Sequence, residues 1–365
     1  MKILEICPFS AGICGVWSRV SQESLEFKKL GYEVQIFSTN IEKGSNNRAP
    51  RQDVFNGITI KRFNAKPSIA SKNVYDFNFD KSFLEYSPDI VITHLLHPHS
   101  FKALKLCKEN NIPCYLVTYA PFNVKRKFPL NFITSVYNQF KVKPYLNKFT
   151  KVIAITKWEY PYLKKLGVNK DKIVYIPNGL PEEFFSEEIN KPVKGNDVLF
   201  LGRIAPVKDL ETLIYAARIL PDINFTIVGG FEEEYLKHLE DIISGNELKN
   251  IKILPPIYDL KNKIKLIDSY KVFVLPSNRE AMPQVLLEAM ARGKLVISSD
   301  TDGGKEVIQN NLNGFLFRIR DFTSLARIIQ HNINGNVPIQ KRAWTDSRKY
   351  SWKKLIKCYT EMFQG

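Results

Sequence analysis

Residues 272–290 read VFVLPSNREAMPQVLLEAM, and this stretch sets the pattern for the whole chain. The first four residues are all apolar, which is typical of a strand covered on both faces in a parallel sheet. A polar loop follows, and Pro283 is a favourable first residue for the helix that the next apolar residues predict. A strand that leads through a short loop into a helix is the repeating unit of an α/β fold.

The same order of strand, loop and helix recurs on both sides of this stretch. The segment 209–220, for example, keeps its apolar residues at helical spacing. We therefore predict an α/β fold with doubly wound parallel sheets. The predicted strands are 2–7, 33–38, 58–63, 90–93, 114–118, 152–155 and 173–176 in the first half, and 198–201, 224–228, 251–254, 272–275, 295–298 and 315–317 in the second.

The predicted strands form two series with a break between them. Pro177-Asn178-Gly179 ends the first series, and an acidic and then polar stretch follows. A chain of 365 residues also fits two domains of roughly 150–180 residues each. We predict a Rossmann-like domain over 1–180, a linker over 181–196, a second Rossmann-like domain over 197–343 and a terminal helix over 344–365.

The composition bounds the partners and the compartment. With 53 Lys and Arg against 37 Asp and Glu, the net charge is +16, which favours phosphates, nucleic acid or an acidic membrane surface as partners. The five cysteines form no CxxC pair and are interpreted as thiols of a reducing, cytosolic compartment. There is no apolar run of about 18 residues, and the apolar start of the chain is too short for a signal peptide.

Two loops that follow predicted strands carry candidate phosphate ligands. Arg203 and Lys208 follow the strand 198–201, and together they could clamp a diphosphate or be ordinary solvated charges. Gly12 and Gly15 follow the first strand, and they fit either a backbone approach to a phosphate at a helix start or a plain tight turn.

Two glutamates stand in the stretch 272–290. Glu280 falls on the loop, and Glu288 falls on a mostly apolar helical segment. A carboxylate in such surroundings needs a partner, such as the hydroxyl pair of a ribose. The free backbone N–H groups at 283–285 could receive phosphate oxygens.

These motifs together resemble the retaining GT-B glycosyltransferases of the family-4 type. The resemblance rests on Glu280-x7-Glu288, Gly202-Arg203-x4-Lys208, Asp302-Gly303-Gly304-x-Glu306, Asn313-Gly314-Phe315 and Pro177-Asn178-Gly179, in the order and spacing of that family. It implies a GT-B fold with a cleft between two Rossmann-like domains and a C-terminal helix that crosses back to the first domain.

The resemblance also implies a role for each matching residue. Glu280 would be the catalytic contact near the reacting carbon of the donor sugar, and Glu288 would bind the ribose. No metal or other cofactor is expected, because cations of the chain would neutralise the leaving diphosphate; Asp300-Thr301-Asp302 is not interpreted as a metal motif. The remaining donor ligands would be Arg203, Lys208, Gly15, Pro283 and Gln284 at the diphosphate, and Ala281 and Met282 at the sugar.

The first domain would bind the acceptor. His94 matches a family histidine at a strand end and is the catalytic candidate there, while His97 and Tyr119 are candidates on the acceptor side. Ala120 stands where many relatives have a second histidine, so one of these three residues would replace it or the acceptor geometry differs. A zinc site at His94, His97 and His99 is not favoured, because no fourth ligand is evident.

The segment 125–151 interleaves basic and aromatic residues without one acid. It fits an interfacial helix on an anionic membrane or a helix that packs its aromatics on its own domain; nucleic acid is the third and least favoured partner.

We therefore expect a cytoplasmic, metal-independent, retaining enzyme, peripheral to the inner membrane face, that moves a sugar from a nucleotide-diphosphate-sugar to a glycan or a lipid-linked saccharide. The alternatives are a nucleotide-sugar epimerase with the same fold and a non-catalytic protein that binds membrane or nucleic acid.

Overall fold

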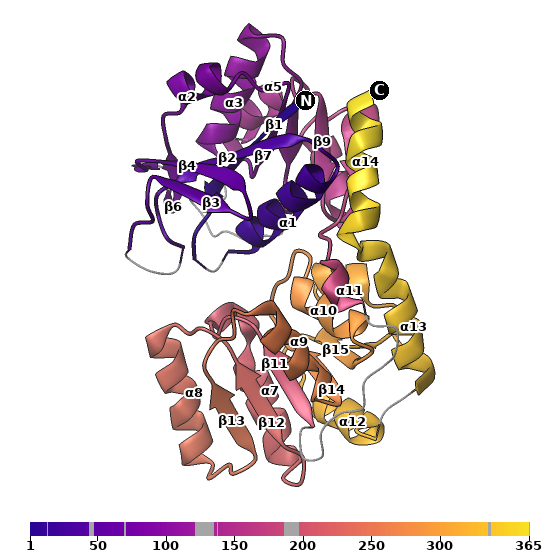
Figure 1. The fold of residues 1–365 in the computed structure, drawn as a ribbon. Coiled ribbons are helices and arrows are strands. Elements are labelled where there is room, and N and C mark those ends of the chain that lie inside the picture. The colour runs from indigo at the N-terminus through magenta and orange to yellow at the C-terminus, as the bar shows by residue number, and fades with distance from the viewer. Residues whose placement is uncertain are drawn as a thin grey trace. The chain divides into compact units, whose positions relative to one another are not determined.

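The structure, a computed structural model, describes residues 1–12, 14–43, 47–68, 71–120, 135–136, 138–185, 197–334 and 337–364. The chain divides into two compact units (Figure 1). Unit 1 comprises Met1–Asn178 and Trp352–Gly365, and unit 2 comprises Gly179–Ser351. The chain therefore passes from one unit to the other twice, after Asn178 and after Ser351.

Unit 1 is built on an eight-stranded sheet with the order β10-β9-β8-β7-β1-β2-β4-β3. Neighbouring strands are parallel except for β3, which pairs antiparallel with β4 at one edge. A separate two-stranded sheet joins β5 (Lys66–Ser68) to β6 (Ser71–Asp76). The strands of the large sheet are β1 (Lys2–Phe9), β2 (Glu33–Thr39), β3 (Gln52–Phe55), β4 (Ile58–Phe63), β7 (Ile90–His94), β8 (Cys114–Val117), β9 (Lys151–Ala154) and β10 (Ile173–Tyr175).

Apolar residues of the parallel strands and the covering helices form the core of unit 1. The C-terminal helix α14 packs on α1, where the rings of Phe27 and Tyr359 lie 5.4 Å apart. Two segments far apart in the sequence thus share one face of this unit (Figure 1). The helices of unit 1 are α1 (Gly15–Lys29), α2 (Asp80–Tyr86), α3 (Pro98–Glu109), α5 (Lys143–Leu146), α6 (Tyr160–Lys165) and α14 (Trp352–Gln364).

Unit 2 is built on a six-stranded, fully parallel sheet with the order β13-β12-β11-β14-β15-β16. The order reverses between β11 and β14, and ligands bind at such switch points in open α/β sheets. The strands are β11 (Val198–Leu201), β12 (Phe225–Val228), β13 (Ile251–Leu254), β14 (Val272–Leu275), β15 (Leu295–Ser299) and β16 (Phe315–Phe317). The helices are α7 (Leu210–Ile219), α8 (Glu233–Gly245), α9 (Leu260–Asp268), α10 (Gln284–Ala291), α11 (Asp302–Val307), α12 (Phe322–Asn332) and α13 (Val337–Ser347).

The α/β prediction is confirmed, and each strand predicted from the sequence is present with ends within two residues. The prediction missed β3, β5 and β6. The edge strand β3 (QDVF) has no apolar run, because its first three residues are exposed. Such a strand carries little of the signal on which strand prediction depends.

The prediction of one terminal helix over 344–365 is wrong. Residues 344–347 end α13 in unit 2, and α14 begins at Trp352 in unit 1. Between them the carbonyl of Tyr350 accepts a hydrogen bond from Leu180 N at 2.7 Å, and Ser351 forms a parallel bridge with Leu180. This extended pairing with a distant segment interrupts the helix. Most of the predicted linker, 186–196, lies outside the described residues, and Glu182–Phe184 form a short 3₁₀ helix.

Candidate active site

Lys208 and Glu280 form an ion pair at one edge of the sheet of unit 2. Lys208 ends a short 3₁₀ helix after β11, and Glu280 lies on the loop after β14. Because β11 and β14 are parallel neighbours, their loops emerge at the same edge. Lys208 Nζ lies 2.6 Å from Glu280 Oε1, and Ser277 Oγ donates to the same oxygen at 2.6 Å. The pair is 17% and 12% exposed, so both charges are largely withdrawn from water.

Backbone contacts fix the loop that carries Glu280. Asn278 N donates to Val207 O at 2.9 Å, and Gly303 N donates to Glu280 O at 3.2 Å. A Cβ at Gly303 would lie 2.7 Å from the carbonyl oxygen of Ala281, so only glycine permits this approach. Three motifs that are far apart in the sequence therefore meet around Glu280.

Glu288 lies on α10, is 3% exposed, and has a partner that the sequence did not indicate. Lys263, on α9, places its Nζ 2.7 Å from Glu288 Oε1 and 2.6 Å from Oε2. Lys263 stands 25 residues before Glu288, and nothing in that spacing connects them; only the packing of α9 beside α10 does. The expectation that a buried acid needs a partner is met by a lysine of the chain itself.

The other donor candidates in unit 2 occupy the same loop and helix start. Ala281 and Met282 follow Glu280 on the loop, and Met282 is buried. Pro283 was predicted as the first helical residue, but its extended ψ of 99° makes it the residue before the helix, and α10 begins at Gln284.

Arg203 does not join Lys208 in the predicted clamp. Arg203 Nη1 lies 2.9 Å from Glu232 Oε1, and the two side chains are 55% and 50% exposed. Among the interactions of the described residues, none connects Arg203 with Lys208 or Glu280. The clamp is not formed in this structure, because Glu232 takes the guanidinium.

The two glycines that follow β1 in unit 1, Gly12 and Gly15, stand in different surroundings. Gly12 has a φ of +77°, and a Cβ there would lie 2.2 Å from the carbonyl oxygen of Lys43. These two structural constraints are enough to explain a glycine at this position. Gly15 begins the helix α1, and the space beside its Cα is open. Gly15 thus stands at the start of a 15-residue helix where a ligand could approach.

His94 ends β7 in a fully buried polar cluster. Its Nε2 lies 2.6 Å from Glu5 Oε2, and its Nδ1 lies 3.0 Å from the hydroxyl of Tyr119. Burial lowers the pKa of His94 to about 3 and raises that of Glu5 well above its usual range. The His94 ring is therefore neutral and held on both sides, and its 0% exposure argues against direct contact with a substrate.

Tyr119 and Ala120, directly after β8, both have positive φ values, +60° and +50°. Non-glycine residues seldom adopt this conformation, and strain of this kind gathers at functional sites. The buried carboxylate of Glu159 holds the turn by accepting hydrogen bonds from Ala120 N at 2.9 Å and from the hydroxyl of Thr118. Tyr119 is half-buried, whereas Glu5 and His94 are fully buried, so Tyr119 is the most solvent-exposed of these three residues.

Arg19, on α1, neutralises the acidic side of the same cluster. Its guanidinium lies 2.9 Å from Glu23 Oε2 and donates to the hydroxyl of Tyr359 at 2.9 Å. Donor atoms of Glu5, Glu23 and His94 lie within 4.8 Å of one another, a spacing that a metal ion could use. However, the guanidinium already supplies a positive charge to Glu23, so a divalent cation does not fit well here.

His97 and His99, the two other histidines that follow β7, lie beside the cluster. His99 is buried and donates through Nε2 to the carbonyl of His94 at 2.8 Å, and His97 precedes α3 and is half-buried. Burial lowers their pKa values to about 3 and about 4. His99 Nε2 thus has its hydrogen-bond partner within the chain itself.

Two family models match this chain. "Glycosyltransferase Family 4" matches residues 13–184, and "Glycosyl transferases group 1" matches residues 181–349. The chain belongs to the family-4 type GT-B glycosyltransferases. The enzyme is thus a transferase, and the prediction of the family and of the GT-B fold is confirmed.

Individual relatives support the assignment to different extents. The enzyme is 33% identical over 183 residues to an Escherichia coli UDP-Gal:alpha-D-GlcNAc-diphosphoundecaprenol alpha-1,3-galactosyltransferase, a match that spans 46% of each chain. An uncharacterized glycosyltransferase of Methanocaldococcus jannaschii is 25% identical and matches over 99% of both chains. Among solved structures, Anabaena HepE in complex with UDP and glucose has a TM-score of 0.78 at 16% identity, covering 100% of this chain and 99% of HepE, which shows the shared fold.

The basic and aromatic segment 125–151 is described only in part, because 121–134 and 137 lie outside the described residues. In the described part, Leu146 and Phe149 are buried in the core, whereas Phe140 is 70% exposed and Tyr145 is 38% exposed. Some aromatics thus pack on the unit itself and others face outward. Within the described ranges, no helix of the enzyme is long and apolar enough to cross a membrane.

Proposed function

We propose that this glycosyltransferase moves a sugar from a nucleotide-diphosphate-sugar to a saccharide or lipid-linked saccharide, with retention of configuration and without a metal ion. The observation that carries the proposal is the Lys208–Glu280 pair with Ser277, enclosed by the Gly303 turn at the switch point of a parallel sheet. The E. coli relative, whose name specifies a UDP-Gal donor and a diphosphoundecaprenol-linked acceptor, supports the substrate class.

Lys208 would stabilise the leaving diphosphate. Negative charge grows there as the glycosidic bond breaks, and a preorganised ammonium stabilises that transition state more than the ground state. Arg203 would leave Glu232 and join it, because an ion pair with both partners half exposed is worth at most about 1 kcal/mol. Two such cations supply the charge that a metal ion provides in other enzymes.

Glu280 and Glu288 would contact the sugar and the ribose. Glu280 presents a carboxylate that Lys208 and Ser277 hold in one place, as a contact to a sugar hydroxyl near the reacting carbon requires. Lys263 holds the carboxylate of Glu288 in place, where it would accept hydrogen bonds from the ribose hydroxyls. The loop residues Ala281 and Met282 would line the donor sugar, and Gly15, Pro283 and Gln284 would contribute at the diphosphate.

In unit 1, Tyr119 and His97 would face the acceptor. Buried His94 would then be a positioning residue, which holds the strained turn at Tyr119 through the hydrogen bond to its hydroxyl. This role replaces the direct catalytic contact that the sequence predicted for His94.

The membrane part of the proposal rests on exposed aromatics beside lysines. Phe140 and Tyr145 are exposed, and Lys143 and Lys148 stand in the same segment. Exposed aromatic and basic side chains together favour an anionic bilayer surface. The enzyme would then meet a lipid-linked acceptor at the cytoplasmic face of a membrane.

The experiment that tests the donor site is thermal melting of the enzyme with UDP, GDP, ADP and their sugars, each measured with and without EDTA. One nucleotide should raise the Tm, and one of its sugars should raise it further. No shift with any of them would refute the donor assignment, and a shift that EDTA abolishes would refute metal independence. The anomeric form of the product, read by NMR, decides between retention and inversion.

The variant Glu280→Gln tests the chemistry at the same site. It should lower kcat by roughly 100- to 1000-fold, the size of one lost transition-state contact, while the nucleotide still raises the Tm. Glu234→Gln, an exposed glutamate on α8, is the matched control and should keep full activity. Unchanged turnover in Glu280→Gln would remove Glu280 from the mechanism.

A further inference from the structure

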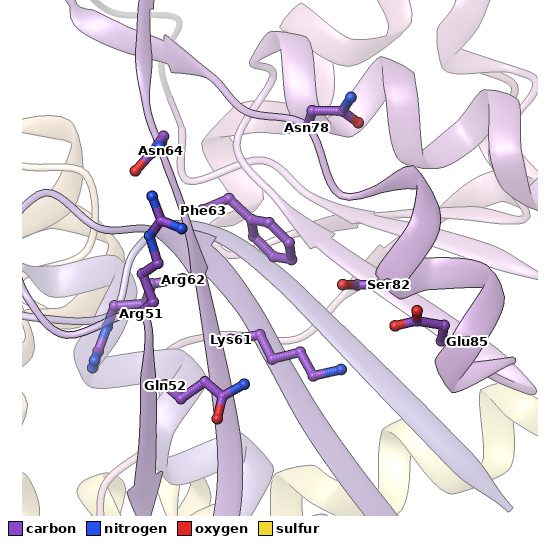
Figure 2. A pocket seen from close by; sticks show the side chains of 9 residues that line it. All are labelled: Arg51, Gln52, Lys61, Arg62, Phe63, Asn64, Asn78, Ser82 and Glu85. Carbon is purple, nitrogen blue, oxygen red and sulfur yellow. The ribbon is translucent and has the colours of Figure 1, made fainter.

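The cationic side chains that line a pocket of unit 1 do not converge on one point. The pocket, with a volume of about 500 Å³, lies between β4 and α2 (Figure 2). Arg51 and Lys61 point in opposite directions there, and Lys61 points toward the side of Glu85 (Figure 2). The buried cluster where β1 and β7 lie side by side is different, because its side chains lie within hydrogen-bond distance of one another. The cluster, and not the pocket, therefore has the geometry of a built site.

Among its described residues, the cluster holds more acids than permanent cations. Arg19 supplies a guanidinium, whereas Glu5 and Glu23 supply two fully buried carboxyl groups. Arg19 Nε lies 2.9 Å from Glu23 Oε2, so these two charges balance each other. A second negative charge would be buried without a counterion, which is costly. Charge balance therefore favours a proton on Glu5.

The hydrogen bonds of Glu5 agree with a protonated acid. Its Oε2 lies 2.6 Å from His94 Nε2, and its Oε1 is buried without a hydrogen-bond partner in the part of the chain that the structure describes. A buried carboxylate needs several donors. Glu159 of the same unit has them: its carboxylate accepts hydrogen bonds from Thr118 Oγ1, Ala120 N, Ile155 N, Thr156 N and Thr156 Oγ1. Glu5, with its single contact, lacks the donors that a charged form requires.

The other ionisable groups around Glu5 leave this balance unchanged. They are the thiol of Cys7, the phenols of Tyr119 and Tyr359, and the ring of His94. Burial raises the pKa values of the thiol and the two phenols well above their ordinary values and lowers the pKa of the ring to about 3, so each is uncharged near pH 7. Burial raises the pKa of Glu23 to about 6, which leaves it ionised at pH 7 to face Arg19.

A neutral acid at Glu5 fixes the tautomer of His94. A neutral imidazole has one N–H group and one bare nitrogen, and the bare nitrogen accepts the proton of a donor. Since Glu5 Oε2–H donates to Nε2, the N–H group of the ring is at Nδ1, 3.0 Å from the hydroxyl of Tyr119. His94 thus donates to the Tyr119 oxygen, and the hydroxyl proton of Tyr119 stays available for another partner.

We propose that Glu5 is a positioning residue, a neutral acid that holds the ring proton of His94 on Nδ1 and thereby keeps the hydroxyl proton of Tyr119 available for donation. The proposal rests on the proposed function, which places Tyr119 at the acceptor, so the proton would be donated to an oxygen of the acceptor. With Glu5 ionised the order reverses: Nε2–H donates to the carboxylate, Nδ1 accepts from Tyr119, and the hydroxyl has no proton to give. A donor that is set before the substrate binds lowers the cost of orienting it.

Long-range ¹H–¹⁵N NMR of the full-length enzyme, labelled with ¹⁵N-histidine, tests this assignment without any substrate. A protonated ring nitrogen and a bare one differ in ¹⁵N shift, and the signals that His94→Gln removes are those of His94. At pH 7 the proton should lie on Nδ1. A proton on Nε2 would overturn the proposal, and so would protons on both nitrogens, which would mean an ion pair with Glu5.

Four variants show which residue sets the tautomer. Glu5→Met has no donor and should lower the ratio of the Nδ1–H form to the Nε2–H form at least tenfold, whereas Glu5→Gln, whose amide N–H can replace the acid proton, should keep the ratio within threefold. Tyr119→Phe and the control Glu33→Gln, an exposed position of β2, should leave it unchanged. A wild-type ratio in Glu5→Met, a ratio in Glu5→Gln as low as in Glu5→Met, or a reversed ratio in Tyr119→Phe would show that Glu5 does not set the tautomer.

Thermal melting with nucleotides on the same samples separates this proposal from the proposed function. A nucleotide that still raises the Tm of Glu5→Met shows that the variant is folded. A nucleotide shift together with the proton of His94 on Nε2 overturns only the role of Glu5. A proton on Nδ1 without any nucleotide shift overturns only the donor site.

Discussion

Replacing Lys263 with Met tests how the buried carboxylate of Glu288 is held. Lys263 Nζ lies 2.6 and 2.7 Å from the two carboxylate oxygens, and Glu288 is 3% exposed. Methionine keeps most of the aliphatic stem of lysine, so the substitution chiefly removes the charge. The carboxylate is then left buried without its counterion.

The size of the effect follows from this geometry. Removing one partner of a buried ion pair costs about 3–5 kcal/mol. Lys263 is 23% exposed, so water already screens part of the attraction that is lost. We therefore expect Lys263→Met to destabilise this part of unit 2 by about 2–3.5 kcal/mol.

Hydrogen exchange followed by mass spectrometry measures this loss locally, which suits a chain of two units. Amides of α10 should exchange roughly 30- to 400-fold faster at pH 7, as about 1.4 kcal/mol corresponds to a factor of ten. Amides of α1 in unit 1 should not change, and Lys265→Met, at an exposed position of the same helix, should change neither helix.

The double variant Lys263→Met/Glu288→Gln provides the decisive comparison. It should regain at least half of the lost protection, because a neutral amide leaves no charge unpaired. If Lys263→Met alters α10 exchange less than fivefold, or if the double variant is as unprotected as the single one, the ion pair does not support this helix.

Two further predictions concern unit 1. Arg19→Met leaves Glu23 buried without its counterion and should destabilise the unit by about 3–5 kcal/mol, with faster hydrogen exchange in α14, whose Tyr359 loses its hydrogen bond; protected amides in α14 would contradict this role. Burial lowers the pKa of His99 to about 3. Below about pH 6.5 the unfolded chain therefore binds a proton at His99 that the folded chain does not bind. The contribution of His99 to stability is thus present above about pH 6.5 and is lost as the pH falls toward 3. His99→Gln should therefore reduce the loss of stability between pH 6 and pH 4 by about 1.4 kcal/mol per pH unit, measured by urea unfolding, and an unaltered pH dependence would show that His99 is protonated in the folded enzyme.

The strands could be predicted because their signal is local. A run such as VFVL at 272–275 is apolar at every position, which only a strand covered on both faces requires. The polar edge strand at Gln52–Phe55 carries no such signal and was missed. The break between α13 and α14 was also missed, because it depends on the backbone pairing of Leu180 with Tyr350 and Ser351.

For the candidate site, the sequence indicated which residues to consider but not the partners of each. Order and spacing of motifs identified Glu280, Glu288 and Lys208, and parallel neighbouring strands bring Glu280 and Lys208 into contact. The partners of other candidate residues could not be predicted from any local pattern in the sequence. Arg203 pairs with Glu232, and His94 is enclosed by Glu5 and Tyr119.

The sequence by itself determined the α/β class, the two series of strands and the family, because hydrophobic periodicity and motif spacing are properties of neighbouring residues along the chain. Tertiary structure alone decided which charges meet and which side chains water reaches. Lys263 pairs with Glu288 because the fold places α9 near α10, and His94 is enclosed by Glu5 of β1 and by Tyr119 of the loop after β8. Such pairings join residues that are 25 to 89 positions apart in the sequence. The fold brings these residues together, and no local sequence pattern indicates that they are in contact.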